Sequence, residues 1–549
     1  MAEQARKTKY VFVAGGVMSS VGKGITASSI ARILQGRGFK VTAMKIDLYV
    51  NVDAGTMSPT EHGEVFVLKD GMECDQDLGN YERFLNRDLT KLHYATTGSI
   101  YLSVIARERN LEYEGRCVSV VPEIPLGFIE AIDAAAEEDK ADIIVVEIGG
   151  TVGEYQSVLV LEAYRILKFK KPDDCVFTLV SYLPVHNGEL KSKPTQYAVR
   201  TVNATGIQPD FIVARASVSI DEKRREKIAF NCNVRTQDVI SGPDVESIYQ
   251  VPLDYEATGF TDVLLEKLKL QSGPKNMKEW EGFVDKVRSA TKPVKICIAG
   301  KYFMTGDFTL TDSYISVIEA VKQASYYNGC KPQISWLDTE DFEKNPEKLK
   351  NLSQYDGVIV PGGFGSRGIE GKIKAIQYCR ENKIPYLGLC YGMQLQVVEY
   401  ARNVAKLKDA NTTEVNAQTA HPVIDILPEQ KANIINKRYG ASMRLGNYTA
   451  KLKKDTVVYA AYNKDEVVER HRHRYEVNPD YIEQIEKAGL VFSGTSPEGK
   501  LMEFAELPKD QHPFFVGTQA HPELISRPLD PHPLFLAFVA AAAKKNSTQ

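Results

Sequence analysis

Short apolar runs alternate with helical patterns along the first half of the chain. Five of these runs end in glycines or polar loops, as buried parallel strands do: YVFVAGG (10–16), KVTAMKIDLYV (40–50), DIIVVEIGG (142–150), CVFTLVSYL (175–183) and DFIVARAS (210–217). Helical patterns such as ITASSIARILQGRG (25–38) lie between them. This alternation predicts a doubly wound α/β layer.

A second series of strand-like runs follows a polar stretch at 271–293, which carries one short amphipathic helical pattern. These runs are VKICIAGK (294–301), DGVIVPGG (356–363), IPYLGLC (384–390) and FFVGTQA (514–520). The 549 residues also exceed what one hydrophobic core normally accommodates. We therefore expect an α/β protein with two doubly wound parallel-sheet domains: a P-loop-like domain at 1–270, a linker at 271–293, and a second domain at 294–549.

Composition argues against several classes of function. Lys and Arg number 68 and Asp and Glu 71, so the formal charge is −3, and without a long basic block we expect no nucleic-acid partner. The sequence has no signal-peptide core and no apolar run of the ~18 residues needed to span a bilayer. Eight cysteines without metal-like spacing suit a reducing cytosol. We expect a cytoplasmic protein that binds small molecules.

The segment GGVMSSVGKG (15–24) indicates a phosphate-binding loop between a strand and a helix. Glycines bring backbone N–H groups onto phosphate oxygens, and Lys23 can reach the β and γ phosphates. The match to a Walker A loop is imperfect, since five residues separate Gly16 from Gly22 and Gly24 replaces the usual metal-binding Ser or Thr. A glycine-rich turn that binds no ligand is the alternative.

Carboxylates and lysines near this loop are candidates for the remaining ligands. Glu147 stands at the carboxyl end of an apolar strand, where open α/β sheets bind ligands, and Asp77 follows in DGMECDQDLG as a second Mg²⁺ candidate. From spacing alone, Asp77 is equally well a solvated loop acid. Lys191 and Lys193 lie two residues apart in GELKSKPTQ, where they either grip a triphosphate or line a solvated surface.

The segment IPYLGLCYGMQ (384–394) predicts a nucleophile elbow with cysteine as the nucleophile. Gly388 and Gly392 permit the crowded turn that lifts Cys390 off the sheet, and the following helix N-terminus favours a thiolate. GTQAHPE offers His521 as the base and Glu523 to orient it. The loop VPGGFG supplies backbone N–H groups for an oxyanion, of which we choose Gly363. The alternative is a buried elbow cysteine with an unrelated histidine.

A histidine-rich segment, RHRHRYEVN (470–478), raises the question of a metal site. No further soft or acidic ligand for His471 and His473 is evident from the sequence. We therefore interpret it as an anion-facing strand.

Together these motifs resemble two known families. Cys390, His521 and Glu523, with PGGFG ahead of the elbow, are similar to the class I glutamine amidotransferase domain, which forms a thioester on its cysteine and releases ammonia from glutamine. The first half resembles the synthetase domain of the CTP synthase family through GGVMSSVGKG, MKIDLYVNVDAGTMSPTEHGEVFV (44–67), DGMECDQDLGNYERF (70–84), VEIGGTVGE, GELKSKPTQ, GIQPDFIVAR and KIAFNCNV. The matches follow the family's order across both domains.

The resemblance implies an ATP-dependent amination of UTP to CTP in pyrimidine biosynthesis, with glutamine as the nitrogen donor. It implies Mg²⁺ ligation by Asp77 and Glu147 and an ammonia gate at His62. It implies ATP contacts at Ser20, Val21, Gly22, Lys23, Gly24, Ile25, Lys45, Asp77, Asp244 and Val245. It implies UTP or CTP contacts at Ser19, Glu154, Tyr155, Gln156, Lys191, Ser192, Lys193, Pro194, Thr195, Gln196 and Lys227. It implies glutamine contacts at Gly363, Tyr391, Gly392, Met393, Gln394, Glu414 and Arg474.

The family further implies GTP as an allosteric activator and homotetramers that can form filaments. One departure concerns the stretch after GGTVG, where the family commonly has Asp-Ile-Glu and this chain has Glu154, Tyr155 and Gln156. Because an amide and a carboxylate bind ribose hydroxyls differently, we expect altered inhibition by CTP with catalysis retained. Two rival interpretations are a cobyrinate-type amidase, which would lack the KSKPTQ loop, and a catalytically silent nucleotide-binding scaffold that polymerises.

Overall fold

The computed structural model describes residues 7–301, 304–305, 308–309, 311–426 and 443–548. The chain forms two compact units. The first consists of Met1–Ala54 and Asp77–Val284, and the second of Gly55–Gln76 and Asp285–Gln549. In the described ranges, no helix combines the length and apolar character that a bilayer crossing requires.

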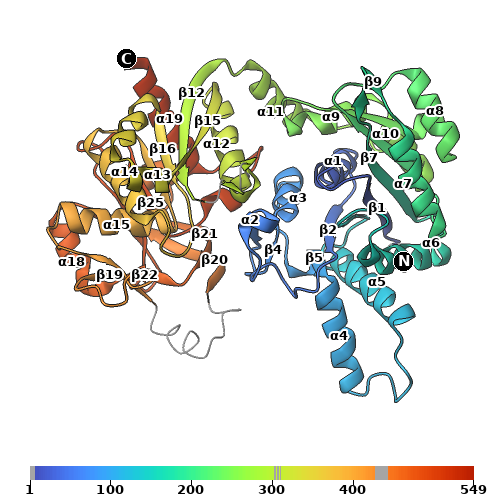
Figure 1. The fold of residues 1–549 in the computed structure, drawn as a ribbon, viewed down its shortest axis with the longest axis horizontal. Helices are drawn as coiled ribbons and strands as arrows, with labels where there is room; N and C mark the ends of the chain where they lie inside the picture. The colour runs from blue at the N-terminus through green and yellow to red at the C-terminus, as the bar shows by residue number, and fades with distance from the viewer. Residues whose placement is uncertain (1–6, 302–303, 306–307, 310, 427–442, 549) are drawn as a thin grey trace, which may run out of the picture. The chain divides into compact units, whose positions relative to one another are not determined.

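The first unit is built on a seven-stranded sheet with the strand order β11-β10-β7-β1-β6-β2-β5, every pair of which is parallel (Figure 1). Its strands are β1 (Lys9–Gly16), β2 (Val41–Asp47), β5 (Tyr94–Thr96), β6 (Ile143–Ile148), β7 (Cys175–Tyr182), β10 (Phe211–Ala216) and β11 (Val239–Pro243). Its helices are α1 (Lys23–Gly36), α3 (Asp77–Leu85), α4 (Thr97–Arg109), α5 (Val120–Glu138), α6 (Val158–Lys170), α7 (Lys193–Ala204), α8 (Glu222–Cys232), α9 (Val251–Ala257) and α10 (Phe260–Lys267). A small hairpin pairs β8 (Val185–His186) with β9 (Glu189–Leu190).

Both faces of this sheet are covered, which explains why its strands are apolar at nearly every position. Phe12 packs in one core cluster with residues of α5 and α6, while the alternate residues Val11 and Val13 are fully buried on the other face. Helix α1 contacts β1, β2 and β6. All five strands expected from the apolar runs are present, and the predicted α/β class is confirmed.

The polar stretch after the first sheet contains helix α11 (Lys278–Ser289). Its apolar side is not exposed, because Trp280 and Phe283 are buried among aromatic residues of the first unit. The indole N–H of Trp280 donates to the Tyr249 carbonyl at 2.8 Å, and the guanidinium of Arg32 lies 5.1 Å from the indole centre. Much of this stretch is therefore anchored structure and not a flexible tether.

The second unit contains a nine-stranded sheet with the order β15-β12-β16-β17-β25-β24-β23-β20-β21. Its strands are β12 (Lys292–Gly300), β15 (Cys330–Asp338), β16 (Gly357–Val360), β17 (Tyr386–Leu389), β20 (Arg444–Leu452), β21 (Glu466–His473), β23 (Val491–Thr495), β24 (Met502–Glu506) and β25 (Phe515–Thr518). The first five in spatial order are parallel, and β24, β23, β20 and β21 add antiparallel pairs. The predicted parallel layer is thus extended by an antiparallel portion.

Helices cover both faces of this second sheet as well: α12 (Ile315–Tyr327), α13 (Thr339–Lys344), α14 (Ile369–Glu381), α15 (Tyr391–Asn403), α17 (Val457–Tyr462), α18 (Pro479–Lys487) and α19 (Pro533–Thr548). Alternate residues of β12 separate two cores, since Cys297 packs with residues of α14 and α15 whereas Ile296 packs with α12 and α19. A smaller sheet joins β18 (Asn411–Thr412), β19 (Pro422–Ile426) and β22 (Tyr475–Val477), and β13 (Met304–Thr305) pairs with β14 (Phe308–Thr309).

A segment from the first half of the sequence belongs to this second unit. Residues 55–76 contain α2 (Pro59–His62) and a hairpin of β3 (Val65–Val67) with β4 (Glu73–Asp75). The hairpin is bound by β21, whose Arg470 donates to the Val67 carbonyl and Arg472 to the Glu73 carboxylate, both at 2.8 Å. Asn447 N–H also donates to the Lys69 carbonyl at 3.0 Å. We call residues 55–76 the inserted hairpin segment.

Candidate active sites

Cys390 occupies a strained turn between β17 and α15. Its φ of 49° and ψ of −99° lie outside the regions that ordinary L residues favour. The turn is held because Cys390 N–H donates to the Thr518 carbonyl at 2.7 Å. A Cβ on Gly392 would lie 2.1 Å from the Val360 carbonyl oxygen, so only glycine lets α15 begin this close to β16. This geometry is that of a nucleophile elbow.

An imidazole–carboxylate pair lies beside this turn, just after β25. His521 Nδ1 is 2.7 Å from Glu523 Oε1, while Nε2 is buried and has no hydrogen-bond partner in the described part of the chain. Burial alone would lower the pKa of His521, but the Glu523 carboxylate and the Cys390 sulfur outweigh it and raise the pKa to about 10. The imidazolium form of His521 is therefore favoured.

One pocket of the second unit brings these groups together. Cys390, His521 and Glu523 line it with Gly362 and Gly363 of the glycine loop. A Cβ on Gly362 would lie 2.8 Å from His521 Cε1 and 3.8 Å from Cys390 Cβ, so the glycine keeps the space between the loop, the ring and the cysteine open. The inserted hairpin segment and β21 complete the wall with Glu64, Val65 and Arg472.

Three further residues expected to contact glutamine cluster near the glycine loop. Glu414 Oε1 accepts from Gly365 N–H at 2.7 Å, and Tyr391 donates to the Gly365 carbonyl at 3.2 Å. Burial raises the pKa of Glu414, against the opposing effect of nearby cations that include Arg474. This loop is thus held in place by side chains from separate segments.

Met393 and Gln394 are placed differently, because their side chains are buried beneath the elbow. Met393 packs against Gly517 of β25, and Gln394 Nε2 donates to the Tyr475 carbonyl at 2.9 Å. Neither they nor Tyr391, Gly392, Glu414 and Arg474 belong to the pocket lining described above.

Two buried lysines and one glutamine at this site were missed from the sequence. Lys301 lies over the Tyr391 ring and bonds the Phe364 carbonyl, and burial lowers its pKa to about 8. Lys372 is fully buried, donates to the Pro361 carbonyl at 3.4 Å, and burial lowers its pKa to about 7. Gln519 Nε2 lies 3.7 Å from Cys390 Sγ. Only Gln519 had a sequence signal, since it lies two residues before His521.

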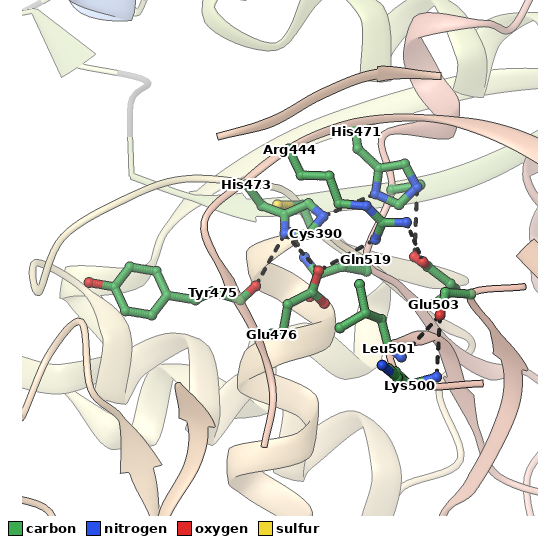
Figure 2. Close-up of polar contacts among 12 residues, drawn as sticks. Cys390, Arg444, His471, His473, Tyr475, Glu476, Lys500, Leu501, Glu503 and Gln519 are labelled. Atoms are coloured by element: carbon green, nitrogen blue, oxygen red, sulfur yellow. Dashed lines mark hydrogen bonds and ion pairs between the residues drawn. The ribbon is translucent and has the colours of Figure 1, made fainter. Parts of the chain in front are cut away.

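The interpretation of RHRHRYEVN as an anion-facing strand is wrong. His471 and His473 are almost fully buried, and their ring nitrogens lie 3.0 Å apart (Figure 2). Acidic partners do exist: Glu503 is 3.6 Å from His471, and Glu476 is 3.5 Å from His473. Burial holds the pKa of both histidines well below its usual range. Arg444 forms ion pairs with both Glu476 and Glu503. They form an internal polar network that connects β20, β21, β22 and β24.

In the first unit, the loop between β1 and α1 has the backbone of an anion-binding turn. Val17, Ser20 and Gly22 all have positive φ, of 81°, 54° and 91°. Such values are rare for a β-branched residue and occur where a turn is held for function. Lys23 folds back over the loop, since a Cβ on Gly15 would lie 2.8 Å from Lys23 Cδ. Ser19 and Ser20 are exposed, whereas Lys23 is buried.

The structure explains why Gly24 replaces the usual Ser or Thr. A Cβ there would lie 2.0 Å from Asp77 Oδ1, so the Asp77 carboxylate occupies the space that the side chain would need. Lys45 Nζ binds Asp77 Oδ2 at 2.5 Å and Glu147 Oε1 at 2.8 Å. Lys45 and Glu147 are direct neighbours in the β2–β6 register. Two strands and the starts of α1 and α3 thus gather two carboxylates and two lysines.

The charges in this cluster are closely balanced. Burial and the neighbouring Asp77 raise the pKa of Glu147 to about 7, despite Lys45. Burial opposes ionisation of Asp77 as well, but Lys45 and Lys23 hold its pKa below the usual value. Burial and Lys45 lower the pKa of Lys23. The two carboxylates supply the oxygen ligands that a hard divalent cation such as Mg²⁺ prefers.

Other candidate nucleotide contacts converge on this loop. A Cβ on Gly16 would lie 2.6 Å from Ala198 of α7 and 3.7 Å from Val152, so the stretches 150–156 and 191–198 flank it. On the other side, Arg215 donates to Asp244 at 2.8 Å, and its Nε would lie 3.4 Å from a Cβ on Gly22. Val245 follows in the same turn. Arg215, at the carboxyl end of β10, is an additional candidate ligand.

Two of the three lysines expected to hold UTP, Lys191 and Lys227, lie near an acidic residue. Lys191 Nζ is 2.6 Å from Glu189 Oε2, and the pKa of Glu189 is lowered by Lys191, Arg224 and Lys227. Lys193 and Pro194 begin α7. Thr195 accepts from Ser181 at the end of β7, and Gln196 donates to Ser192 at 3.1 Å. Lys191, Arg224 and Lys227 therefore lie near one carboxylate.

Residues 154–156, which differ from the family's usual sequence, and the expected ammonia gate at His62 also have defined positions. Glu154 accepts from the backbone N–H and the hydroxyl of Thr151 at 2.7 and 2.6 Å, so it stabilises its own turn. Tyr155 is 97% exposed and Gln156 is exposed, so both can reach a ligand. His62 lies in the inserted hairpin segment, 3.6 Å from Asp75. Ile25 is half-buried in the first turn of α1.

Comparison with known proteins identifies the family. The model for the CTP synthase N-terminus matches residues 9–270, and that for class-I glutamine amidotransferases matches 309–541. The CTP synthase of Carboxydothermus hydrogenoformans is 50% identical over 543 residues, covering 98% of this chain and 99% of the relative. That of Pyrococcus furiosus is 50% identical over 539 residues, covering 97% and 98%. A solved glutaminase domain of Trypanosoma brucei CTPS with bound acivicin is 39% identical, covers 46% of this chain and 94% of its own, and has a TM-score of 0.42. The chain belongs to the CTP synthase family.

Proposed function

We propose that this protein aminates UTP to CTP, using ATP and the ammonia released from L-glutamine, in pyrimidine nucleotide biosynthesis. The observation that carries the proposal is the cysteine elbow beside an imidazole–carboxylate pair, in a chain that matches the CTP synthase family over nearly its whole length. The enzyme is a ligase with glutamine as its amide-nitrogen donor. An amidase that acts on carboxylates is disfavoured by this family membership, and UTP-dependent ATP hydrolysis separates the two activities.

Glutamine hydrolysis takes place at Cys390. The thiolate attacks the side-chain amide carbon of glutamine. Backbone N–H groups of the glycine loop stabilise the negative oxygen that forms, and Gly363 is the proposed donor. His521 delivers a proton to the departing nitrogen, so the C–N bond breaks and ammonia and a thioester result. Water, deprotonated by His521, then cleaves the thioester to glutamate, and Glu523 fixes the ring throughout.

The synthetase reaction takes place at the loop of the first unit. The γ-phosphoryl group of ATP passes to O4 of the uracil ring, after which ammonia attacks C4 and phosphate leaves, giving CTP, ADP and phosphate. Lys23 and Lys45 offset the negative charge on the transferring group. Asp77 and Glu147 would hold Mg²⁺, which would offset negative charge on the phosphates when bound. The nucleotide contacts inferred from the family, including Asp244, Lys191 and Lys227, belong to the same proposal.

Ammonia must move between the two reactions without being protonated by bulk water, and His62 is proposed as a gate on its path. The decisive experiment is the Cys390→Ala variant with UTP, ATP and Mg²⁺. Glutamine-driven CTP formation should disappear, while formation from added ammonium chloride should persist. Equal loss of both activities would contradict a separate ammonia-producing centre.

Several finer assignments rest on the family. They are GTP as an allosteric activator and a homotetramer that can assemble into filaments. The domain limits 1–270, 271–293 and 294–549 rest instead on the pattern of apolar and polar stretches in the sequence. A cytoplasmic location is supported by eight cysteines that are all free. Glutaminase assays with GTP and light scattering with nucleotides test the first two.

A further inference from the structure

Gln519 is buried directly behind the nucleophile. It follows β25, is fully buried, and its backbone N–H donates to the Glu503 carbonyl at 2.9 Å. Its side-chain nitrogen Nε2 lies 3.7 Å from Cys390 Sγ, within the longer range of hydrogen bonds to sulfur (Figure 2). The Cys390 sulfur also lies 3.7 Å from the Arg472 carbonyl, which accepts a proton from a thiol but repels a thiolate.

The orientation of the Gln519 amide is fixed by a second glutamine. Gln394 Nε2 lies 2.9 Å from the Tyr475 carbonyl and 3.3 Å from Gln519 Oε1. Since a carbonyl can only accept, Gln394 must present its nitrogen to Tyr475. The same nitrogen then requires an oxygen from Gln519, and this turns the Gln519 NH₂ group toward the sulfur. The reversed amide would place two donors against each other.

We propose that Gln519 is a catalytic residue of glutamine hydrolysis, whose N–H stabilises the Cys390 thiolate, and that Gln394 is the positioning residue that keeps this amide in its donating orientation. A hydrogen bond to an ionised acceptor is stronger than one to a neutral acceptor, so the interaction favours the thiolate over the thiol. The inference rests on the proposed role of Cys390 as nucleophile. It also gives the Gln394 side chain a function that requires no contact with the substrate.

Other charged groups face the same sulfur. His521 and Lys372 interact electrostatically with Cys390, and Glu523 acts through His521. The buried histidine His473 lies on β21, the strand that also carries the Arg472 carbonyl. All of these groups stay in place when only residue 519 is changed, so a shift in sulfur ionisation then reports on the amide.

The test measures the alkylation rate of Cys390 by iodoacetamide as a function of pH in the full-length protein. A Cys117→Ser background removes the one exposed cysteine, and Cys390→Ala supplies the blank. In Gln519→Met, the pH of half-maximal alkylation should rise by about one unit, since hydrogen bonds to charged groups are worth roughly that much. The glutaminase kcat should fall about tenfold at neutral pH for the same reason, with KM little changed. Ammonium-driven CTP synthesis should not change.

Gln396 provides a matched control. It is also a fully buried glutamine of α15, but its amide donates to the Ala505 carbonyl at 3.4 Å and not to sulfur. Gln396→Met should therefore leave the alkylation profile unchanged while removing a comparable buried amide. If Gln519→Met does not fold, Gln394→Met should shift the profile in the same direction by a smaller amount, and Gln519→Glu should shift it further by placing a carboxylate at the sulfur.

The outcomes distinguish failure of the role proposed for Gln519 from failure of the proposed function. A wild-type alkylation profile in Gln519→Met, or in Gln394→Met and Gln519→Glu together, overturns the role of Gln519. An equal shift in Gln396→Met overturns it too, because general loosening of the core would then be the cause. Glutaminase activity that survives in Cys390→Ala would instead overturn the proposed function itself.

Discussion

Replacing Gly24 by alanine should lower the rate of CTP synthesis about 10²-fold, although alanine is the better helix former. Gly24 lies in the first turn of α1, where the change to alanine would by itself stabilise the helix by about 0.5–1 kcal/mol. The added Cβ would, however, lie 2.0 Å from Asp77 Oδ1 and 2.6 Å from Cγ. Ordinary C···O contacts are about 3.3 Å, so the carboxylate must move by about 1 Å or more.

That movement separates Asp77 from Lys45, whose Nζ lies 2.5 Å from Asp77 Oδ2. A hydrogen bond to a charged group contributes about 1.5–3 kcal/mol, so the net effect should be destabilisation of the first unit by about 1–2 kcal/mol. The catalytic effect should be larger. Misplacement of a ligand by about 1 Å costs on the order of 10²-fold in rate.

The assay is CTP formation from UTP, ATP, Mg²⁺ and ammonium chloride, which bypasses glutamine hydrolysis. Gly24→Ala should lose about 10²-fold in this assay while glutaminase activity is retained. Gly282→Ala is the matched control, because Gly282 lies in α11 within the first unit and no atom lies within 4 Å of the added Cβ. It should be fully active and slightly more stable. Wild-type synthesis by Gly24→Ala would refute the steric account of this loop.

Three further predictions concern protonation and feedback. The pKa of His521 is raised from 6.5 to about 10, so the stability it contributes is complete below pH 6.5 and is lost as pH rises through about 10. Each unit of pKa shift corresponds to about 1.4 kcal/mol, so the free energy of urea unfolding should fall by several kcal/mol as pH rises through that window. Glu523→Gln should make this fall much smaller, and an unchanged pH dependence would contradict the ion pair. The pKa of Glu147 is raised from 4.5 to about 7, so its carboxylate must lose a proton before it binds a metal ion near neutral pH. The affinity for Mg²⁺, measured by calorimetry, should therefore rise up to about tenfold per pH unit until pH 7. A similar slope in Glu147→Gln would exclude this carboxylate as a ligand. Gln156→Glu should alter CTP inhibition while catalysis is retained, and an inhibition curve identical to that of the wild type would remove Gln156 from the feedback site.

The sequence predicted nine parallel strands of the two large sheets, because burial makes them apolar, whereas β5, β11 and β15 were not predicted. Runs such as DIIVVEI are apolar throughout, and a run of this kind ending in a glycine loop has few other interpretations. The antiparallel strands were missed for the opposite reason, apart from the end of β21, which the interpretation of RHRHRYEVN as a strand covered. β21 reads EVVERHRH, and the polar residues of this strand are buried through pairing with other buried polar groups, as His471 is with Glu503. Partners so distant in sequence cannot be inferred from local pattern.

The same distinction applies to the candidate sites. The elbow glycines, Cys390, His521 and Glu523 were recognisable because local spacing determines the chemistry, and Cys390, His521 and Glu523 line one pocket. The role of Gly24 was not recognisable, since it depends on Asp77 fifty-three positions later in the chain. Lys372 gave no signal either, because a lysine in an amphipathic helix is ordinarily solvated and here its ammonium is fully buried.

The inserted hairpin segment changes how genetic variants of this enzyme should be interpreted. Glu73 is encoded among residues that match the synthetase family, yet its carboxylate holds Arg472, whose strand borders the nucleophile. A missense change at Glu73 should therefore be grouped with changes that affect glutamine hydrolysis and not with those that affect nucleotide binding. Complementation between two separately expressed halves would likewise depend on which half carries this short stretch of chain.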